Sequence, residues 1–210
     1  MPFKYACFIS YCHGQYDLTK AFIDQLKRAL KSELEPLLDE EVYIDEDRLK
    51  PGYLYNEALA RAICQSVCMV VVYSPRYERH SYCGREFAGM ELLEQARRKL
   101  LGSGAGARGF IVPVIFRGEA DLPPRITEGR HYADLSQFSL AGTDISRHPQ
   151  YVVEIRKMAQ LIYENYRAFG AAGADACTVC DTFALPPEGA LPPWRAVSRS
   201  TTAVFPGREA

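Results

Sequence analysis

The sequence lacks the long apolar runs, the strong net charge and the leader segment that mark several broad classes of protein. No stretch approaches the ~20 apolar residues of a membrane-spanning helix, and the N-terminus MPFKYACFIS turns polar too early for a signal peptide. The net charge of −1 gives no electrostatic reason to bind nucleic acid or an acidic membrane. We therefore expect a cytoplasmic protein that binds neither.

The chain also has few of the patterns that mark common cofactor and metal sites. It contains no GxGxxG, GxxxxGK[ST] or GxSxG motif, and the glycine-rich stretch at 102–109 precedes a strand pattern instead of opening a helix. Its seven cysteines are odd in number and mostly lie in apolar runs, which favours buried reduced thiols over a disulfide framework. Cys177-x-x-Cys180 has no second pair downstream, so we expect no metal site.

Short, continuous apolar runs are what the sequence does have. They span residues 5–10, 42–44, 68–73 and 110–116, with a weaker one at 131–135. Strands that are buried on both faces have this appearance. Between them the apolar period becomes helical, at 17–34, 53–65, 82–101 and about 149–168. The alternation predicts an α/β fold, with a mainly parallel sheet and helices on both faces.

Two segments depart from this regular pattern. Pro113 falls inside the fourth run, and we expect it near a sheet edge or at a bulge, because proline cannot donate to a sheet ladder. Residues 170–210 are rich in Ala, Gly, Pro and Ser and have no sustained period, so they are expected to form a flexible tail after a domain at 1–169. Trp194 within that tail is either part of a docking peptide or unstructured.

Candidate site residues lie in the loops that follow the strands, because ligands of open parallel sheets collect beyond the carboxyl ends of the strands. These loops are residues 10–17, 45–52, 74–86 and 117–125. In the third of them, Tyr82 and Glu86 are four residues apart and share one face of the predicted helix. Taken alone, this pair is either a solvated helix start or the edge of a site.

Three motifs occur in order and at similar spacing to those of one family. FISY ends the first strand, DRLKPG occupies 47–52, and S-P-x-Y…Y-C-x-x-E follows the third strand at 74–86. Together they resemble the Toll/interleukin-1 receptor (TIR) domain family over about residues 4–168. The resemblance implies a flavodoxin-like sheet, and it places Glu86 where NAD-consuming TIR enzymes carry their essential glutamate. Tyr82 stands where the family usually has tryptophan.

The resemblance also implies the partners and the remaining site residues. NAD+ is then the substrate, and no cofactor is needed. Other TIR protomers and a downstream effector that senses the nucleotide product are the implied protein partners. The implied substrate-binding residues are Ser10, Tyr11, Arg48, Tyr82 and Cys83. The implied assembly loop contains Asp47, Arg48, Pro51 and Gly52.

Two functions remain open at this point. The chain resembles freestanding bacterial immune TIR enzymes, which implies a NAD+ glycohydrolase or cyclase of antiviral (anti-phage) defence. A single carboxylate such as Glu86 could suffice, because nicotinamide leaves NAD+ as a neutral molecule and needs no general acid. The alternative is a non-catalytic TIR adaptor that acts through TIR–TIR assembly, in which Glu86 is an ordinary helix residue.

Overall fold

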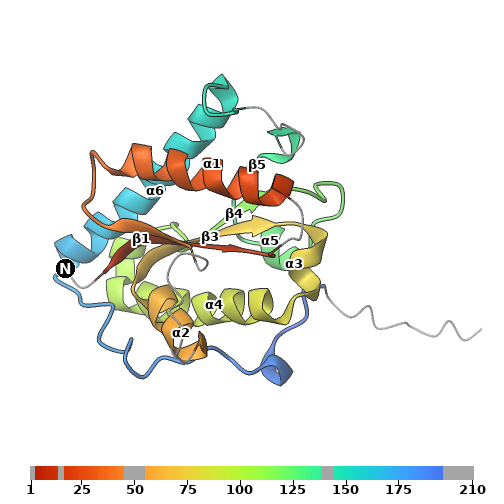
Figure 1. Ribbon diagram of the computed structural model, residues 1–210. Helices are drawn as coiled ribbons and strands as arrows, with labels where there is room; N and C mark the ends of the chain where they lie inside the picture. The colour runs from red at the N-terminus through yellow and green to blue at the C-terminus, as the bar shows by residue number, and fades with distance from the viewer. Residues whose placement is uncertain (1–2, 14–16, 45–54, 139–143, 196–210) are drawn as a thin grey trace, which may run out of the picture.

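The computed structural model describes residues 3–13, 17–44, 55–138 and 144–195 of the 210-residue chain (Figure 1). Within them, one parallel sheet has the strand order β2-β1-β3-β4-β5. The strands are β1 (Tyr5–Tyr11), β2 (Glu41–Ile44), β3 (Ser66–Tyr73), β4 (Ile111–Ile115) and β5 (Ala133–Asp134). This is the flavodoxin-like order, which confirms the predicted fold class.

Helices cover both faces of the sheet. They are α1 (Asp17–Leu34), α2 (Tyr55–Cys64), α3 (Pro75–Arg79), α4 (Ser81–Leu101), α5 (Pro124–Thr127) and α6 (Pro149–Ala172), with short 3₁₀ turns at Gly102–Ala105, Ser136–Phe138 and Glu188–Ala190. Helices α1 and α6 lie on one face, and α2 and α4 lie on the other (Figure 1). None of the helices in the described residues is long and apolar enough to cross a membrane.

The central strands β1 and β3 explain the continuous apolar runs of the sequence. Every residue of both strands is buried, and Cys7 pairs with Cys68 while Ser10 pairs with Val71. Because helices cover both faces, side chains on both sides of these strands enter the core, and the usual alternation of polar and apolar residues disappears. Ser10, near the carboxyl end of β1, is therefore a buried polar residue that needs a hydrogen-bond partner.

Pro113 lies at a position of β4 where no backbone N–H is needed for a hydrogen bond between strands. The Phe110 carbonyl and the Phe116 N–H both form hydrogen bonds with β3. Backbone groups alternate in direction along a strand, so those of the odd-numbered residues between them, including Pro113, point toward β5. Strand β5 begins opposite Val114 and does not reach Pro113. The expectation that Pro113 lies near a sheet edge is confirmed, because β4 is flanked on that side only by this two-residue strand.

The expectation of a flexible tail from residue 170 is wrong for the part of the tail that the structure describes. Helix α6 continues to Ala172 and ends at Gly173, whose φ of +58° favours glycine. Residues 173–195, here called the outer segment, then run along the outside of the α2–α4 layer and reach α3 (Figure 1). Leu185 is buried against α4, where a Cβ at Gly89 would come within 2.8 Å of it.

A disulfide fixes the outer segment to α2. Cys180 is bonded to Cys64, 116 residues earlier in the sequence. The expectation that all thiols are reduced is therefore wrong for this pair, which sequence spacing could not reveal because the two residues meet only through the tertiary fold. The other cysteines are free thiols, and four of these five are buried.

Candidate functional site

The carboxylate of Glu86 lies at the carboxyl edge of the sheet, where the first turns of α4 pass the end of β1. Its residue is only 6% exposed. The hydroxyl of Ser10 donates a hydrogen bond to Glu86 Oε2 over 2.5 Å. Two residues that the sequence analysis assigned to the site, 76 positions apart, are thus in direct contact. Glu86 is not a solvated helix residue, because its side chain points into the protein.

A third residue, Tyr77 of α3, completes this contact and was not among the predicted site residues. Its hydroxyl lies 2.6 Å from Ser10 Oγ, and its side chain is fully buried. Because Ser10 uses its one proton on the carboxylate, Tyr77 must be the donor to Ser10. Burial, followed by the charges of Cys83 and Glu86, raises the pKa of Tyr77 well above its ordinary value, so the phenol keeps its proton.

Cys83 lies beside this chain of hydrogen bonds and is paired with another thiol. It is buried at the start of α4, close to Cys12, which follows the end of β1 and donates a hydrogen bond to the His13 carbonyl. Interaction with the Cys83 thiol, helped by the positive charge of Arg76, lowers the pKa of Cys12, whereas interaction with Cys12 and burial raise the pKa of Cys83. Cys12 is therefore the member of the pair that ionises first, and sequence reasoning did not single it out.

Tyr82 differs from Glu86 in its accessibility. Its side chain is 38% exposed, its ring lies 6.3 Å from that of His80, and the Arg85 guanidinium lies 5.7 Å from the ring centre. Tyr82 therefore presents an aromatic surface to solvent one helical turn before Glu86, whereas the carboxylate is buried. Tyr11, the last residue of β1, is buried with its ring 4.5 Å from that of His13.

The predicted assembly loop falls outside the described residues. Asp47, Arg48, Pro51 and Gly52 all lie in the range 45–54, so their predicted roles stay predictions. The loop after β4 is described and does reach the site region. At Gly118, with φ of +86°, the backbone approaches α3 so closely that a Cβ would come within 2.8 Å of Pro75. The loops after β3 and β4 therefore meet at this edge, as expected.

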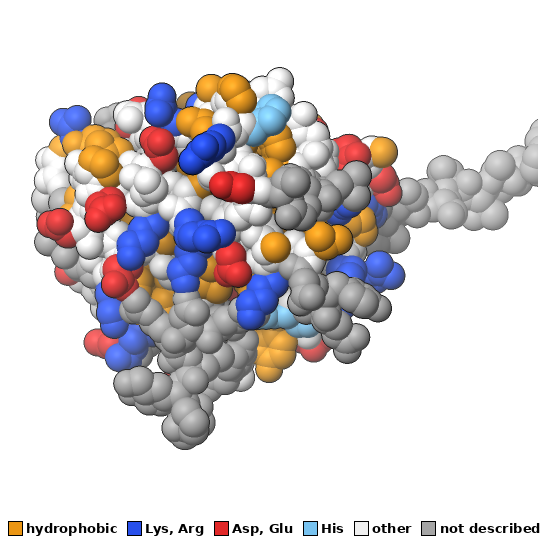
Figure 2. All heavy atoms as spheres, turned by 45° about the horizontal axis from the view of Figure 1, so that its top comes forward, with side chains coloured by type: hydrophobic (Ala, Val, Ile, Leu, Met, Phe, Trp, Pro, Cys, Tyr) orange, Lys and Arg blue, Asp and Glu red, His pale blue; other side chains and the backbone are white. Residues whose placement is uncertain are grey.

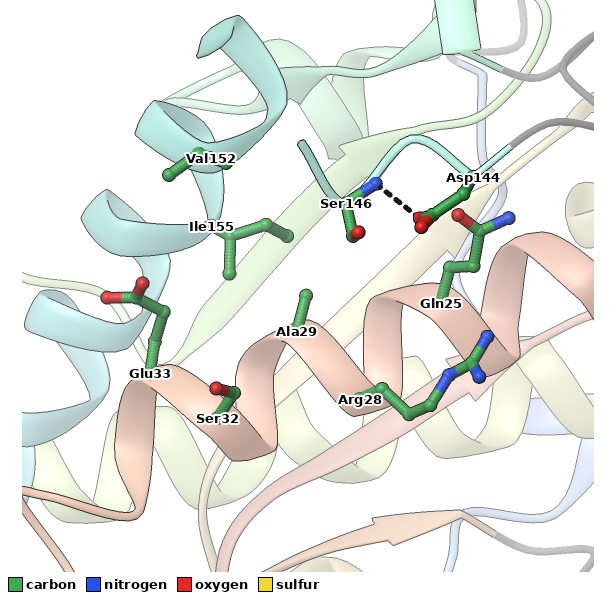
Figure 3. A pocket seen from close by; sticks show the side chains of 9 residues that line it. All are labelled: Gln25, Arg28, Ala29, Ser32, Glu33, Asp144, Ser146, Val152 and Ile155. Carbon is green, nitrogen blue, oxygen red and sulfur yellow. Dashed lines mark hydrogen bonds between the residues drawn. The ribbon is translucent and has the colours of Figure 1, made fainter. Parts of the chain in front are cut away.

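A separate pocket of about 610 Å³ lies between α1 and α6 (Figure 3). Its lining combines charged and apolar side chains, including Arg28, Glu33 and Ile155, and Asp144 accepts a hydrogen bond from the Ser146 N–H. No residue that lines it belongs to the end of β1, α3 or α4. Over this side of the molecule, acidic and basic side chains are intermingled (Figure 2).

No group of three or more His, Cys, Asp or Glu side chains suited to a metal ion occurs among the described residues. The reactive group at this edge of the sheet is the carboxylate of Glu86, which is held in place by the neutral hydroxyl donors Ser10 and Tyr77. Such a group can accept hydrogen bonds from substrate hydroxyls and can stabilise a developing positive charge.

The sequence profile of the TIR domain matches residues 7–146, which contain every element from β1 to β5 except the first two residues of β1. This chain belongs to the TIR domain family. The match includes Ser10, Tyr77, Cys83 and Glu86, but it ends before α6 and the outer segment. The resemblance inferred from the three sequence motifs is thereby confirmed.

Other comparisons add little to this TIR domain. No curated protein matches its sequence significantly. Among solved structures, the TIR domains in the structure of the activated Roq1 resistosome directly recognizing the pathogen effector XopQ are similar. The identity is 20%, over 75% of this chain and 82% of that chain, with a TM-score of 0.36. A likeness at this level carries no argument about activity.

Proposed function

We propose that this TIR domain is a NAD+ glycohydrolase or cyclase, which cleaves the bond between nicotinamide and ribose. Nicotinamide would leave with the bonding electrons, and water would add to the ribose carbon and lose a proton to give ADP-ribose; a nucleophilic atom of a nucleotide in place of water would give a cyclic or modified ADP-ribose that acts as a signal. The observation that supports the proposal most directly is the buried carboxylate of Glu86, held by Ser10 at the carboxyl edge of a TIR sheet.

The chemistry of NAD+ suits a site with one carboxylate. Ordinary glycosidases need a second carboxyl group to protonate the leaving oxygen. The nicotinamide of NAD+ departs from a pyridinium and becomes neutral as it leaves, so no proton has to be supplied. Positive charge develops on the ribose instead, and a carboxylate that is already oriented stabilises it without reorganisation. We assign this role to Glu86, and we assign to the exposed ring of Tyr82 the packing of ribose or nicotinamide.

The wider role follows from the family resemblance. We assign the protein to cytoplasmic immune signalling, with antiviral defence as its setting and an effector that senses the nucleotide product as its partner. Activity would depend on association of TIR protomers through residues 45–52, with Arg48 and Pro51 at the contact. NAD+ is the substrate in this scheme, and no further cofactor takes part.

The decisive experiment replaces Glu86 by glutamine, which keeps the shape of the side chain and removes its charge. We expect Glu86→Gln to lower kcat for NAD+ cleavage by ~10²–10³, the loss typical of a deleted electrostatic stabiliser. Nicotinamide release would be followed by chromatography, and the second product would be identified by mass spectrometry. The thermal melting curve should barely change, because glutamine has a similar helix propensity and its side-chain carbonyl can still accept the hydrogen bond from Ser10.

The matched control is Glu57→Gln, which makes the same chemical change at an exposed position of α2. It should leave kcat unchanged. If Glu86→Gln cleaves NAD+ at the wild-type rate with its fold intact, the enzyme proposal is wrong and the TIR adaptor becomes the better description of this chain.

A further inference from the structure

We infer that Trp194 is a positioning residue for the Glu86 carboxylate, and that it acts through Tyr77 without touching the substrate. The inference rests on the function proposed above. Trp194 lies near the end of the outer segment, beyond the residues that match the TIR domain, so the family assigns it no role. Four steps of structure connect it to the carboxylate.

The first step is the contact between Trp194 and two aromatic rings. Its ring meets Phe87 of α4 edge to face, at a centroid distance of 4.9 Å, and it meets Tyr77 of α3 in the same way at 5.6 Å. The guanidinium of Arg125 lies 4.5 Å from the centre of the tryptophan ring. These distances and orientations are in the favourable range for aromatic pairs and cation–π contacts. Trp194 therefore packs closely against Tyr77 and the side chains around it.

The second step is the anchoring of the segment that carries Trp194. Arg125 donates a hydrogen bond to the Pro192 carbonyl over 3.0 Å. Arg195 donates to both carboxylate oxygens of Glu78, at 2.9 and 3.0 Å, and forms an ion pair with Asp121. Glu78 follows Tyr77 in α3. The outer segment therefore contacts this helix in two ways, through the ring of Trp194 and through the bidentate ion pair of Arg195.

The third step is the weakness of α3 by itself. It contains only five residues, Pro75–Arg79, and a helix of this length is not stable without tertiary contacts. The position of the Tyr77 ring therefore depends on what packs around it. Ser10 and Phe87 belong to elements that the core fixes, whereas Trp194 and Arg195 belong to the outer segment.

The fourth step is the hydrogen-bond chain from Tyr77 to Ser10 to Glu86. Each hydroxyl in it has one proton, so the direction of donation is fixed once the carboxylate is ionised. If Tyr77 moves, Ser10 loses the hydrogen bond that it accepts, and its own donation to the Glu86 carboxylate is weakened, because Tyr77 no longer polarises the Ser10 hydroxyl. The carboxylate is then held less firmly in the geometry that stabilises the ribose, and small misplacements of this kind are costly for rate.

The test is a double-mutant cycle on the full chain with Tyr77→Phe and Trp194→Ala. We expect Tyr77→Phe to lower kcat roughly tenfold, because one buried hydrogen bond is lost, and Trp194→Ala to lower it roughly threefold to tenfold. The double variant should be no slower than Tyr77→Phe alone, because both changes remove the same support. KM for NAD+ should change little in all three variants, because neither residue binds the substrate in this scheme.

Controls separate positioning from loss of structure. Trp194→Phe keeps an aromatic ring and should retain at least about half of the wild-type kcat. Asp181→Asn removes the exposed ion pair between the outer segment and Arg61, far from α3, and should leave kcat unchanged. Trp194 is the one tryptophan of the chain, so its fluorescence reports whether the segment is in place. Its emission should be the same in Tyr77→Phe as in the wild type.

The outcomes are distinguishable from those of the proposed function. If Glu86→Gln is inactive but Trp194→Ala retains the wild-type kcat, the positioning role is wrong and the enzyme proposal stands. Losses that multiply in the double variant would also overturn the positioning role, because they would show that Trp194 acts independently of Tyr77. If Glu86→Gln remains fully active, both proposals fall together.

Discussion

The two faces of the sheet are covered to different depths. Helices α1 and α6 lie against each other on one face, with a pocket between them (Figure 3). On the other face, α4 lies against the sheet and is covered in turn by the outer segment (Figure 1). Helices α3 and α4 carry Tyr77 and Glu86, whereas α1 and α6 carry none of the candidate site residues. The outer segment therefore covers the face whose helices hold the Glu86 carboxylate in position.

Removal of the disulfide is the strongest test of this difference between the two faces. Within the described residues, the disulfide joins the outer segment to α2 and so acts on the α2–α4 face alone. We expect Cys180→Ser to lower the free energy of unfolding by roughly 5 kcal/mol, as the model of loop closure predicts for a loop of this length. The measurement is chemical denaturation without reductant. Cys177→Ser, which removes a free thiol of the same segment, should cost much less. Equal stabilities of wild type and Cys180→Ser would show that the outer layer adds nothing.

The attachment of the outer segment to α3 should depend on pH through Glu78. Burial would raise the pKa of Glu78, but hydrogen bonds from Arg195 and Tyr73 outweigh it, and the pKa lies below its ordinary value of 4.5. A depressed carboxyl pKa stabilises the attachment above that ordinary value, and the stabilisation is lost as the pH falls through the depressed one. The emission of Trp194 should therefore shift to longer wavelength in acid below pH 4.5.

The control for this pH dependence is Glu78→Gln, which cannot titrate at the same position. Asp121, the other carboxylate on Arg195, is 82% exposed and remains in that variant. A shift of equal size and midpoint in Glu78→Gln would assign the transition to other groups.

The opposite face should respond least. Arg156 of α6 and Glu33 of α1 form an ion pair with a Nε–Oε2 distance of 3.3 Å, and their side chains are 68% and 32% exposed. Exposed pairs of this kind contribute little, so Glu33→Gln should change the free energy of unfolding by less than ~0.5 kcal/mol. Denaturation under the conditions used for Cys180→Ser measures both variants on one scale. A loss comparable to that of Cys180→Ser would remove the contrast between the faces.

Local patterns predicted the strands and the four longer helices α1, α2, α4 and α6, because these elements have a clear apolar period, but they did not predict the short helices α3 and α5. The runs around β1, β3 and β4 were found within a residue or two, since burial on both faces leaves them almost wholly apolar. Glu94 of α4 is buried, although carboxylates are seldom buried unless they are paired. It accepts a hydrogen bond from the Phe110 N–H and forms an ion pair with Arg130, and periodicity cannot anticipate such partners.

The candidate site was also only partly predictable, because it depends on contacts between residues that are far apart in the sequence. Glu86 and Ser10 were identified through the family resemblance, but the hydrogen bonds of Ser10 with Tyr77 and with Glu86 join residues 67 and 76 positions apart and depend on the fold. The outer segment left no periodic signal, because it has little secondary structure and packs through a few scattered side chains. A possible clue was Gly89 in the middle of α4, where a glycine is unfavourable unless something passes close to the helix.

The bond between Cys64 and Cys180 also determines how tension would pass through the molecule. A pull on the two ends of the chain would travel from residue 64 to residue 180 through sulfur, bypassing the 116-residue interval between them. At roughly 3.4 Å per extended residue, about 400 Å of chain would be unavailable for stretching. Strands β3, β4 and β5, with the helices α3 to α6, all lie inside this closed ring. Tyr77 and Glu86 would therefore be mechanically shielded, whereas Ser10, on the open arm of the chain, would be the first of the three to be drawn away.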